Sequence, residues 1–206
     1  MERSERDTVG RLASRVRRLT MTRLAPIVYS RAAAMTPPMP VEEFAMSDKT
    51  KVDLFRSIHK TTPGFEHGPI VDDKAVIGVL YPDFEIRDLG RGKTRAADVE
   101  TFTGDGGVKM VRTGGGTSLF DKAFALPGGT KFWYCFKIPT DTIIPDSLKV
   151  RFTDKNERFK ANHYQIEVKT GTMSVDAMKG ALDNMARNAI VRLVELGDIK
   201  PSVLVH

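Results

Sequence analysis

Three groups of side chains in this sequence have the types that bind and activate a polar substrate. An imidazole titrates near neutral pH and can exchange protons. A guanidinium presents a planar fork that can hold two anionic oxygens, and hydroxyls that follow a run of glycines lie where the backbone can approach a ligand closely. The candidates are Arg56, then Gly115, Gly116, Thr117 and Ser118, then His163, Gln165 and Glu167.

Each group also has a purely structural explanation. An arginine in a strand usually lies on the solvated face of its sheet. The Gly-Gly-Gly-Thr-Ser run is compatible with a turn that caps a short helix over residues 120–125. A histidine in a strand is more often a satisfied structural residue than a catalyst. Taken singly, none of the groups indicates a function.

Other motifs fail on spacing. Residues 90–94 echo a phosphate-binding loop, but Arg87 stands where the pattern needs a glycine. Ser118 lacks the glycine that a hydrolase nucleophile elbow has two positions later. Cys135 lies in an aromatic run typical of a core, so we do not pair it with His163. With one cysteine and scattered histidines, an intramolecular disulfide and a multi-cysteine zinc site are excluded, and we expect no metal.

Short strands followed by one long helix must position these groups. Polar and glycine-rich residues 82–107 read mostly as loop. In the segment around His163, the side chains at 163, 165 and 167 share one face because strands have a two-residue period. Strands before a late helix, without regular alternation, predict an α+β fold. We expect strands over residues 51–60, 75–81, 108–112, 131–138 (a central strand), 148–152 and 162–168.

The clearest predicted element is the final helix. Ser174 is a suitable N-cap and Asp176 favours the first turn, while Gly197 is typical of the position just after a helix. Apolar side chains recur at spacings of three and four, which predicts a buried stripe. The stripe comprises Met178, Leu182, Met185, Ala189, Leu193 and Leu196.

Composition and charge divide the chain into an arm and a body. Of 206 residues, 41% are hydrophobic and 28% charged, which excludes collagen-like and wholly disordered chains. No apolar run approaches the roughly 18 residues of a membrane span, so we expect no membrane partner. Residues 1–40 hold eight arginines and three acidic residues, whereas the other 166 residues carry 24 basic and 23 acidic residues. Because the body is nearly neutral, we expect no nucleic-acid interface on it.

We therefore expect a basic N-terminal arm over residues 1–45, a folded domain over residues 46–200, and a tail over residues 201–206. The arm has no acidic residue from Thr8 to Pro40, and its apolar and arginine positions alternate at helical spacing. This pattern is typical of a mitochondrial transit peptide and predicts a mitochondrial location. The alternative is a disordered basic extension on a cytoplasmic protein, and the acidic residues before Thr8 favour it.

Several separated blocks occur in an order that matches a known family. Together they resemble the second exported effector toxins of bacterial type VI secretion systems, whose fold is ADP-ribosyltransferase-like. The resemblance covers about residues 50–196 and is densest from Gly115 onward. Several ordered blocks are more specific than any one motif. The blocks are Leu54–Arg56; Gly115–Ala123 with Thr117, Ser118 and Asp121; Ile144 and Leu148–Val150; Ala161–Ile166 with His163; and Leu182–Arg192 with Asp183, Asn184, Arg187 and Asn188.

The resemblance implies an ADP-ribosyltransferase-like α+β fold, with two small packed β-sheets around a cleft and a long C-terminal helix. It implies an NAD-dependent toxin that uses NAD as substrate and transfers ADP-ribose to an unknown acceptor macromolecule. It also implies a neutralising, immunity-type partner protein. Two alternatives stay open: an NAD glycohydrolase, which passes the sugar to water, and a non-catalytic basic interaction module that acts through the arm.

The resemblance also implies roles for individual residues. In that toxin family the positions matching Thr117, Ser118 and His163 are implicated in toxicity, so these three are the catalytic candidates. Arg56 is carried over from the wider transferase class as a contact to the ribose or phosphate of NAD. Gly115 and Gly116, next to the hydroxyl pair, complete the expected NAD-binding set.

Glu167 resembles the acid of the Gln/Glu-x-Glu element of some transferases. The toxin relatives have no acid at the matching position. Either Glu167 supplies a catalytic carboxylate in this chain, or the family uses a different stabiliser and Glu167 is a surface residue.

Overall fold

One five-stranded antiparallel sheet and the C-terminal helix share most of the hydrophobic core. The computed structural model describes residues 48–200 except 89 and 91, all of them within the unit Phe44–His206. The predicted arm (residues 1–45) and tail (residues 201–206) lie outside the described residues and stay predictions.

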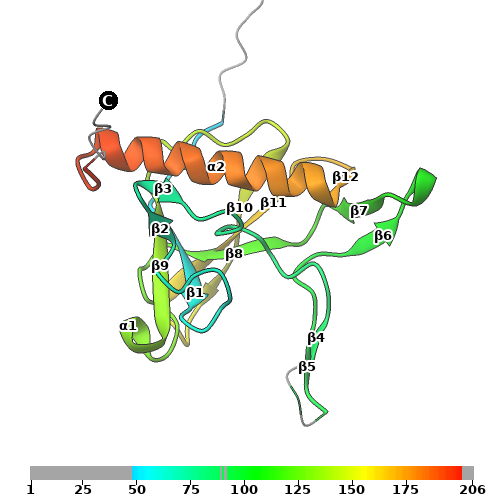
Figure 1. Ribbon diagram of the computed structural model, residues 1–206, viewed down its shortest axis with the longest axis horizontal. Helices are drawn as coiled ribbons and strands as arrows, with labels where there is room; N and C mark the ends of the chain where they lie inside the picture. The colour runs from blue at the N-terminus through cyan, green and yellow to red at the C-terminus, as the bar shows by residue number, and fades with distance from the viewer. Residues whose placement is uncertain (1–47, 89, 91, 201–206) are drawn as a thin grey trace, which may run out of the picture. The chain divides into compact units, whose positions relative to one another are not determined.

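Most elements of the described chain are short strands, and the long C-terminal helix comes last, as the sequence predicts (Figure 1). They are β1 (Leu54–His59), β2 (Ile70–Val71), β3 (Lys74–Ala75), β4 (Arg87–Asp88), β5 (Thr94–Arg95), β6 (Thr101–Thr103), the 3-10 helix η1 (Asp105–Gly107), β7 (Lys109–Arg112), β8 (Gly116–Phe120), α1 (Gly129–Phe132), β9 (Trp133–Ile138), β10 (Leu148–Asn156), β11 (Ala161–Val168), β12 (Thr172–Ser174) and α2 (Val175–Glu195).

The main sheet has the strand order β10-β11-β8-β1-β9, and every pairing in it is antiparallel. A second sheet has the order β12-β7-β6, and β2-β3 and β4-β5 form two short hairpins. The α+β class with small sheets and a long C-terminal helix is confirmed. The prediction that residues 131–138 form a central strand is wrong, because among the described strands β9 pairs with β1 alone and closes one edge of the sheet.

The strand predicted over residues 75–81 is also wrong. Only Lys74 and Ala75 are in a strand, and the chain then turns, with Gly78 at φ +84°. Val79 and Leu80 are nevertheless buried, at 1% and 0% exposure. These residues are apolar because their loop is part of the core. A short apolar run does not distinguish a buried loop from a strand.

The hydroxyl pair lies inside a strand, because β8 runs through residues 116–120 and pairs with β11. Neither a turn at Thr117 and Ser118 nor a helix over residues 120–125 forms. Pairing with β11 satisfies the backbone groups of this segment, and a local turn would leave them without that ladder.

Helix α2 follows its prediction closely. The Ser174 side chain accepts a hydrogen bond from the Ala177 N–H, which caps the first turn. Five of the six predicted stripe residues are buried, whereas Leu196 is 48% exposed because it is the C-cap residue, where the helix ends. Gly197 follows at φ +76°, a conformation that glycine adopts without strain. The helix contributes a whole face of Met178, Leu182, Met185, Ala186, Ala189, Ile190 and Leu193 to the core.

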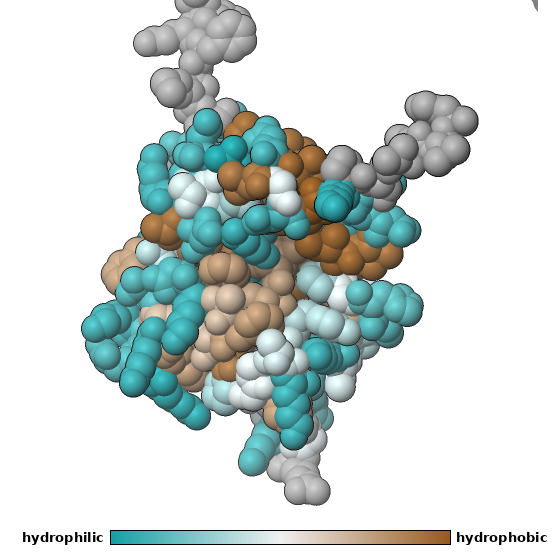
Figure 2. All heavy atoms as spheres, turned by 90° about the vertical axis from the view of Figure 1, so that its left-hand side faces the viewer, coloured by the Kyte–Doolittle hydropathy of each residue, from teal (hydrophilic) through white to brown (hydrophobic). Residues whose placement is uncertain are grey.

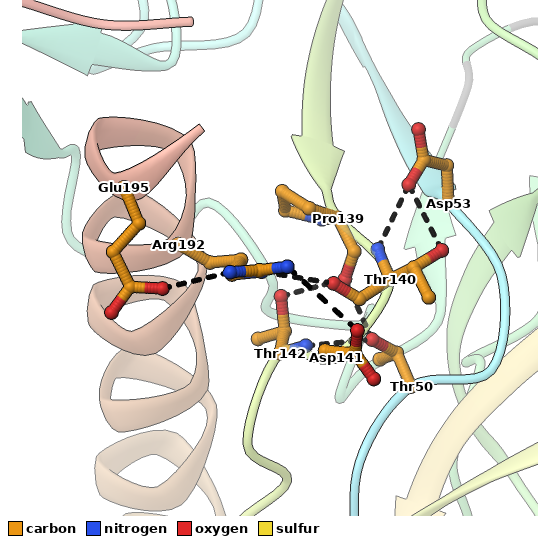
Figure 3. A network of polar contacts seen from close by, with 8 residues as sticks. All are labelled: Thr50, Asp53, Pro139, Thr140, Asp141, Thr142, Arg192 and Glu195. Atoms are coloured by element: carbon orange, nitrogen blue, oxygen red, sulfur yellow. Dashed lines mark hydrogen bonds and ion pairs between the residues drawn. The ribbon is translucent and has the colours of Figure 1, made fainter. Parts of the chain in front are cut away.

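A polar network ties the end of α2 to the turn after β9 (Figure 3). The Arg192 side chain donates to the Thr140 carbonyl at 3.3 Å and pairs with Glu195 at 3.0 Å. On the other side of the turn, Asp53 accepts from the Thr140 N–H at 2.8 Å. The turn is thus held between the helix and the start of β1, which fixes the edge of the main sheet against α2.

The side of the molecule that carries α1 and β9 is mixed in polarity. Figure 2 shows apolar residues along the middle of this side, between hydrophilic flanks. No helix among the described residues is long and apolar enough to cross a membrane.

Candidate active site

A cleft of about 1380 Å³ opens between the two larger sheets and α2. Pockets for ordinary small ligands are about 300–1,000 Å³, so this cleft has room for a dinucleotide. Strand β1, strand β8, the loop that follows β3 and the start of α2 all contribute to its walls. The lining includes Arg56, Tyr81, Ser118, Phe120, His163 and Lys179.

The cleft opens where two central strands separate. Strands β1 and β8 have one register pair, Phe55 with Phe120. Beyond this pair, the Ser118 carbonyl accepts from Nη1 of Arg56 at 3.1 Å. In a continuous ladder a backbone N–H of β1 would donate to such a carbonyl. A side chain that fills a gap in a ladder keeps the strands apart and still satisfies the carbonyl.

Arg56 does not lie on a solvated face. It alternates with buried Leu54 and Ile58 and stands opposite buried Phe136, so its side chain leaves β1 on the core face. Its Nη2 donates to the Tyr81 carbonyl at 3.0 Å, and its buried Nε has no partner among the described residues. Burial lowers the pKa of the guanidinium, which stays charged at neutral pH.

The loop containing Tyr81 is fastened from several sides. The Tyr81 hydroxyl donates to Asp183 at 2.7 Å, and the Gly78 N–H donates to the other oxygen of the same carboxylate at 3.0 Å. Burial and the adjacent Asp183 raise the pKa of Tyr81, so its hydroxyl stays protonated. The Thr117 hydroxyl donates to the carbonyl of Leu80, the residue before Tyr81. Together these bonds fix the carbonyl that Arg56 uses.

Thr117 and Ser118 therefore occupy different environments. Thr117 is 0% exposed on the core face, whereas Ser118 lines the cleft from the other face. Adjacent strand residues point to opposite sides of a sheet. This arrangement does not allow both hydroxyls to contact NAD, although the resemblance led us to expect both contacts. Ser118 can reach a ligand in the cleft, whereas buried Thr117 supports the wall of the cleft.

His163 lies on the same side as Ser118. It pairs with Phe120 in the β8–β11 ladder, while Gln165 pairs with Ser118. The imidazole and the Phe120 ring are 5.2 Å apart between centroids, and the Nδ1 atom contacts the Thr153 hydroxyl at 2.6 Å. Arg56, Ser118 and His163 thus line one cleft, Arg56 from the core face of β1 beside the gap between β1 and β8, and Ser118 and His163 from the other face.

Glu167 is neither in the cleft lining nor on the surface. The residue is 1% exposed. Its carboxylate accepts from the Arg151 Nε at 2.7 Å and from the Gly114 N–H at 2.9 Å, and it lies 3.4 Å from the Lys149 ammonium. The interpretation of Glu167 as a surface residue is wrong, because this ion pair with β10 buries it. A carboxylate held in this way joins β10, β11 and the loop before β8.

The two glycines are required by packing. A side chain at Gly115 would collide with the Asp98 carbonyl, and one at Gly116 would collide with the Ile166 carbonyl of β11. Neither glycine lines the cleft. Their lack of a Cβ lets β8 approach its neighbours closely, so in this structure they support the site from behind.

Sequence reasoning missed several residues that build the site. Asp183 stood within a matched block, but nothing in its spacing indicated that it holds Tyr81. Arg87 and Arg95 both pair with the largely buried Asp83 at the cleft edge. The rim also carries Lys179, whose ammonium lies 5.9 Å from the Tyr81 ring and 5.5 Å from the Phe84 ring. Among the residues that the structure describes, no three His, Cys, Asp or Glu side chains cluster as a metal site.

Comparison with known proteins gives two matches to one family. The family described as Tse2 ADP-ribosyltransferase toxin matches residues 41–194, which is most of the chain. Toxin Tse2 of Pseudomonas aeruginosa strain PAO1 is 32% identical over 152 residues, which cover 70% of this chain and 92% of that protein. The family match spans the positions of Arg56, Ser118 and His163.

Proposed function

This chain belongs to the Tse2 ADP-ribosyltransferase toxin family, and from that premise we propose that it binds NAD in the cleft and transfers ADP-ribose to an acceptor macromolecule. The single observation that carries the proposal is the meeting of Arg56, Ser118 and His163 at one cleft large enough for a dinucleotide. The three come from strands that are distant in sequence, and only the fold brings them together.

The cleft also suits the charge of NAD. A diphosphate is anionic, and the lining carries more basic than acidic side chains: Arg56, Arg87, Arg95, Lys109 and Lys179 against Asp83, Glu85 and Asp176. Arg87, Arg95 and Lys109 are paired with Asp83 or Glu85, so Arg56 and Lys179 are the cations that no lining carboxylate pairs with among the described residues. Arg56 keeps one unpaired, buried N–H at the separation of β1 and β8. A guanidinium that is already fixed by two carbonyls needs no reorganisation when it meets a phosphate or ribose oxygen.

The reaction breaks the bond between the nicotinamide nitrogen and ribose C1, and nicotinamide leaves with the bonding electrons. The ribose then has oxocarbenium character, and an oxygen or nitrogen of the acceptor forms the new bond to C1. In the proposal Ser118 orients the nicotinamide ribose, and His163 accepts the proton that the acceptor loses. Glu167 takes no part in this scheme, because its carboxylate is engaged with Arg151 and Gly114.

The test is to incubate the full chain and a cell extract with NAD labelled in the adenine, and to follow nicotinamide release and labelled macromolecules. Release together with labelled macromolecule supports the transferase, whereas release with only free ADP-ribose supports a glycohydrolase. No release, combined with no NAD binding in calorimetry, would overturn the proposal and favour a non-catalytic interaction module. The variants S118A and H163A should lose release, and E157Q, an exposed residue on the β10–β11 connection, should keep it.

Two further parts of the proposal concern partners and location. We expect a neutralising protein that blocks the cleft, so its binding should compete with NAD. Residues 1–45 are proposed as a mitochondrial targeting signal, and a fluorescent fusion of these residues should enter mitochondria. A fusion that stays in the cytosol would instead support the disordered-extension interpretation.

A further inference from the structure

A β-bulge in β10 places two polar side chains opposite one histidine. In the β10–β11 ladder Phe152 pairs with Tyr164, and Asp154 pairs with His163, so Thr153 is an extra residue without its own partner. A bulge of this kind sets two residues of one strand against one residue of the other, and such bulges re-aim side chains. Here the side chains of the extra residue Thr153 and of the paired residue Asp154 both lie near the His163 ring.

The polar contacts of the His163 ring among the described residues are confined to one nitrogen. Nδ1 of His163 lies 2.6 Å from the Thr153 Oγ1 and 3.3 Å from the Asp154 Oδ1. The structure gives no hydrogen bond to the other ring nitrogen, Nε2, among the described residues, and His163 lines the cleft. The ring is therefore held at Nδ1 by β10, and Nε2 is the ring nitrogen left without a hydrogen-bond partner among the described residues.

The Thr153 hydroxyl decides which nitrogen carries the proton. Its Oγ1 lies 2.9 Å from the Asp154 Oδ1 and 3.0 Å from the His163 carbonyl, and both of these oxygens are acceptors only. The hydroxyl has one proton. If it donated that proton to Nδ1, Oγ1 would face both acceptor oxygens with no proton between them. If it donates to one of these oxygens, Nδ1 must carry a proton of its own to bond Oγ1. The arrangement is satisfied when Nδ1 carries a proton and donates it to Oγ1.

From this geometry we propose that Thr153 and Asp154 are positioning residues that keep neutral His163 in the Nδ1-protonated tautomer, which leaves Nε2 unprotonated toward the cleft. The inference rests on the proposed function for its consequence: Nε2 is then the atom that accepts the acceptor's proton as the acceptor oxygen or nitrogen bonds to ribose C1. Which ring nitrogen acts in a histidine is generally set by the hydrogen bond that the other makes. Neither residue touches the substrate itself.

The tautomer is tested by nitrogen-15 NMR of the full chain without NAD, at a pH where His163 is neutral. The wild type should show a protonated Nδ1 and an unprotonated Nε2. T153V keeps the shape but removes the hydroxyl, so the ring should populate both tautomers, whereas T153S should restore the wild-type spectrum. D154N should weaken the preference, and E157Q serves as a nearby control on the same strand connection. A wild-type protein with a protonated Nε2 would overturn the inference.

The catalytic consequence is tested by the rate of nicotinamide release and transfer. T153V should lower the rate at saturating NAD by about the fraction of His163 that leaves the Nδ1-protonated tautomer, which is a several-fold loss and less than the roughly 10²–10⁴-fold that a general base contributes. Its KM for NAD should change little. T153S should recover most of the rate. A T153V protein with an altered tautomer and a wild-type rate would overturn the role of Nε2. Because the NMR measurement needs no substrate, it decides the positioning even if the wild type releases no nicotinamide.

Discussion

Thr117 and Ser118 are adjacent in the sequence but lie on opposite faces of the main sheet. Thr117 donates to the Leu80 carbonyl inside the core, and Ser118 lines the cleft beside Arg56. The two hydroxyls therefore affect the protein in different ways, one through stability and the position of the loop, the other through contact with a ligand.

Substitution of each hydroxyl should separate these effects. T117V leaves the buried Leu80 carbonyl without its donor, which should lower the free energy of unfolding by about 1–3 kcal/mol. S118A should change stability by less than about 0.5 kcal/mol but should reduce nicotinamide release sharply. Denaturant unfolding and product assays check both variants. Equal losses of stability in the two variants would contradict the opposite placement of the side chains.

Arg56 should not be replaceable by lysine. A lysine has one ammonium and cannot span the Ser118 and Tyr81 carbonyls as the fork does. R56K should lower the free energy of unfolding by about 1–3 kcal/mol for each carbonyl left unpaired, and should weaken NAD binding in calorimetry. The matched control is R158K, an exposed arginine over the Phe159 ring. If R56K bound NAD like the wild type, Arg56 would have no part in the NAD site.

E167Q distinguishes a structural carboxylate from a catalytic one. The amide oxygen can still accept from the Gly114 N–H, but the charge that pairs with Arg151 is lost. Arg151 is partly exposed, which limits the cost, so the free energy of unfolding should fall by about 1–3 kcal/mol. The rate per folded molecule should stay close to that of the wild type. A large drop in kcat without a change in stability would instead assign Glu167 a catalytic role.

The network between β9 and α2 should give a pH-dependent contribution to stability. Burial alone raises the pKa of Asp53, but hydrogen bonds from Thr140 and Lys137 outweigh it, so the pKa is lowered overall. A lowered pKa means that the contribution is fully present above the ordinary value of about 3.9 and is lost as the pH falls through the lowered value.

D53N should therefore be less stable than the wild type at neutral pH, by up to about 1 kcal/mol because Asp53 is 43% exposed. The difference should shrink when unfolding is measured at progressively lower pH. A difference that grew as the pH fell would contradict the sign of the shift.

The local sequence was enough to predict the elements in which side chains of one kind recur on one face of a helix or strand. The cap at Ser174 and the apolar stripe of α2 follow from the 3.6-residue period, and the alternation around His163 follows from the two-residue period. The ordered blocks were enough to indicate the family. The apolar residues 79–80 were misassigned, because local hydrophobicity is the same for a buried loop and a buried strand.

Tertiary structure alone decided how the site is built. Strand pairing turned a glycine-rich run into β8 and thereby separated Thr117 from Ser118. The separation of β1 and β8 placed Arg56 between Ser118 and Tyr81, and the bulge in β10 set Thr153 against His163. These relations depend on strand order and register, which are fixed by packing between segments far apart in the chain, whereas the residue types and their local periods are written in the sequence itself.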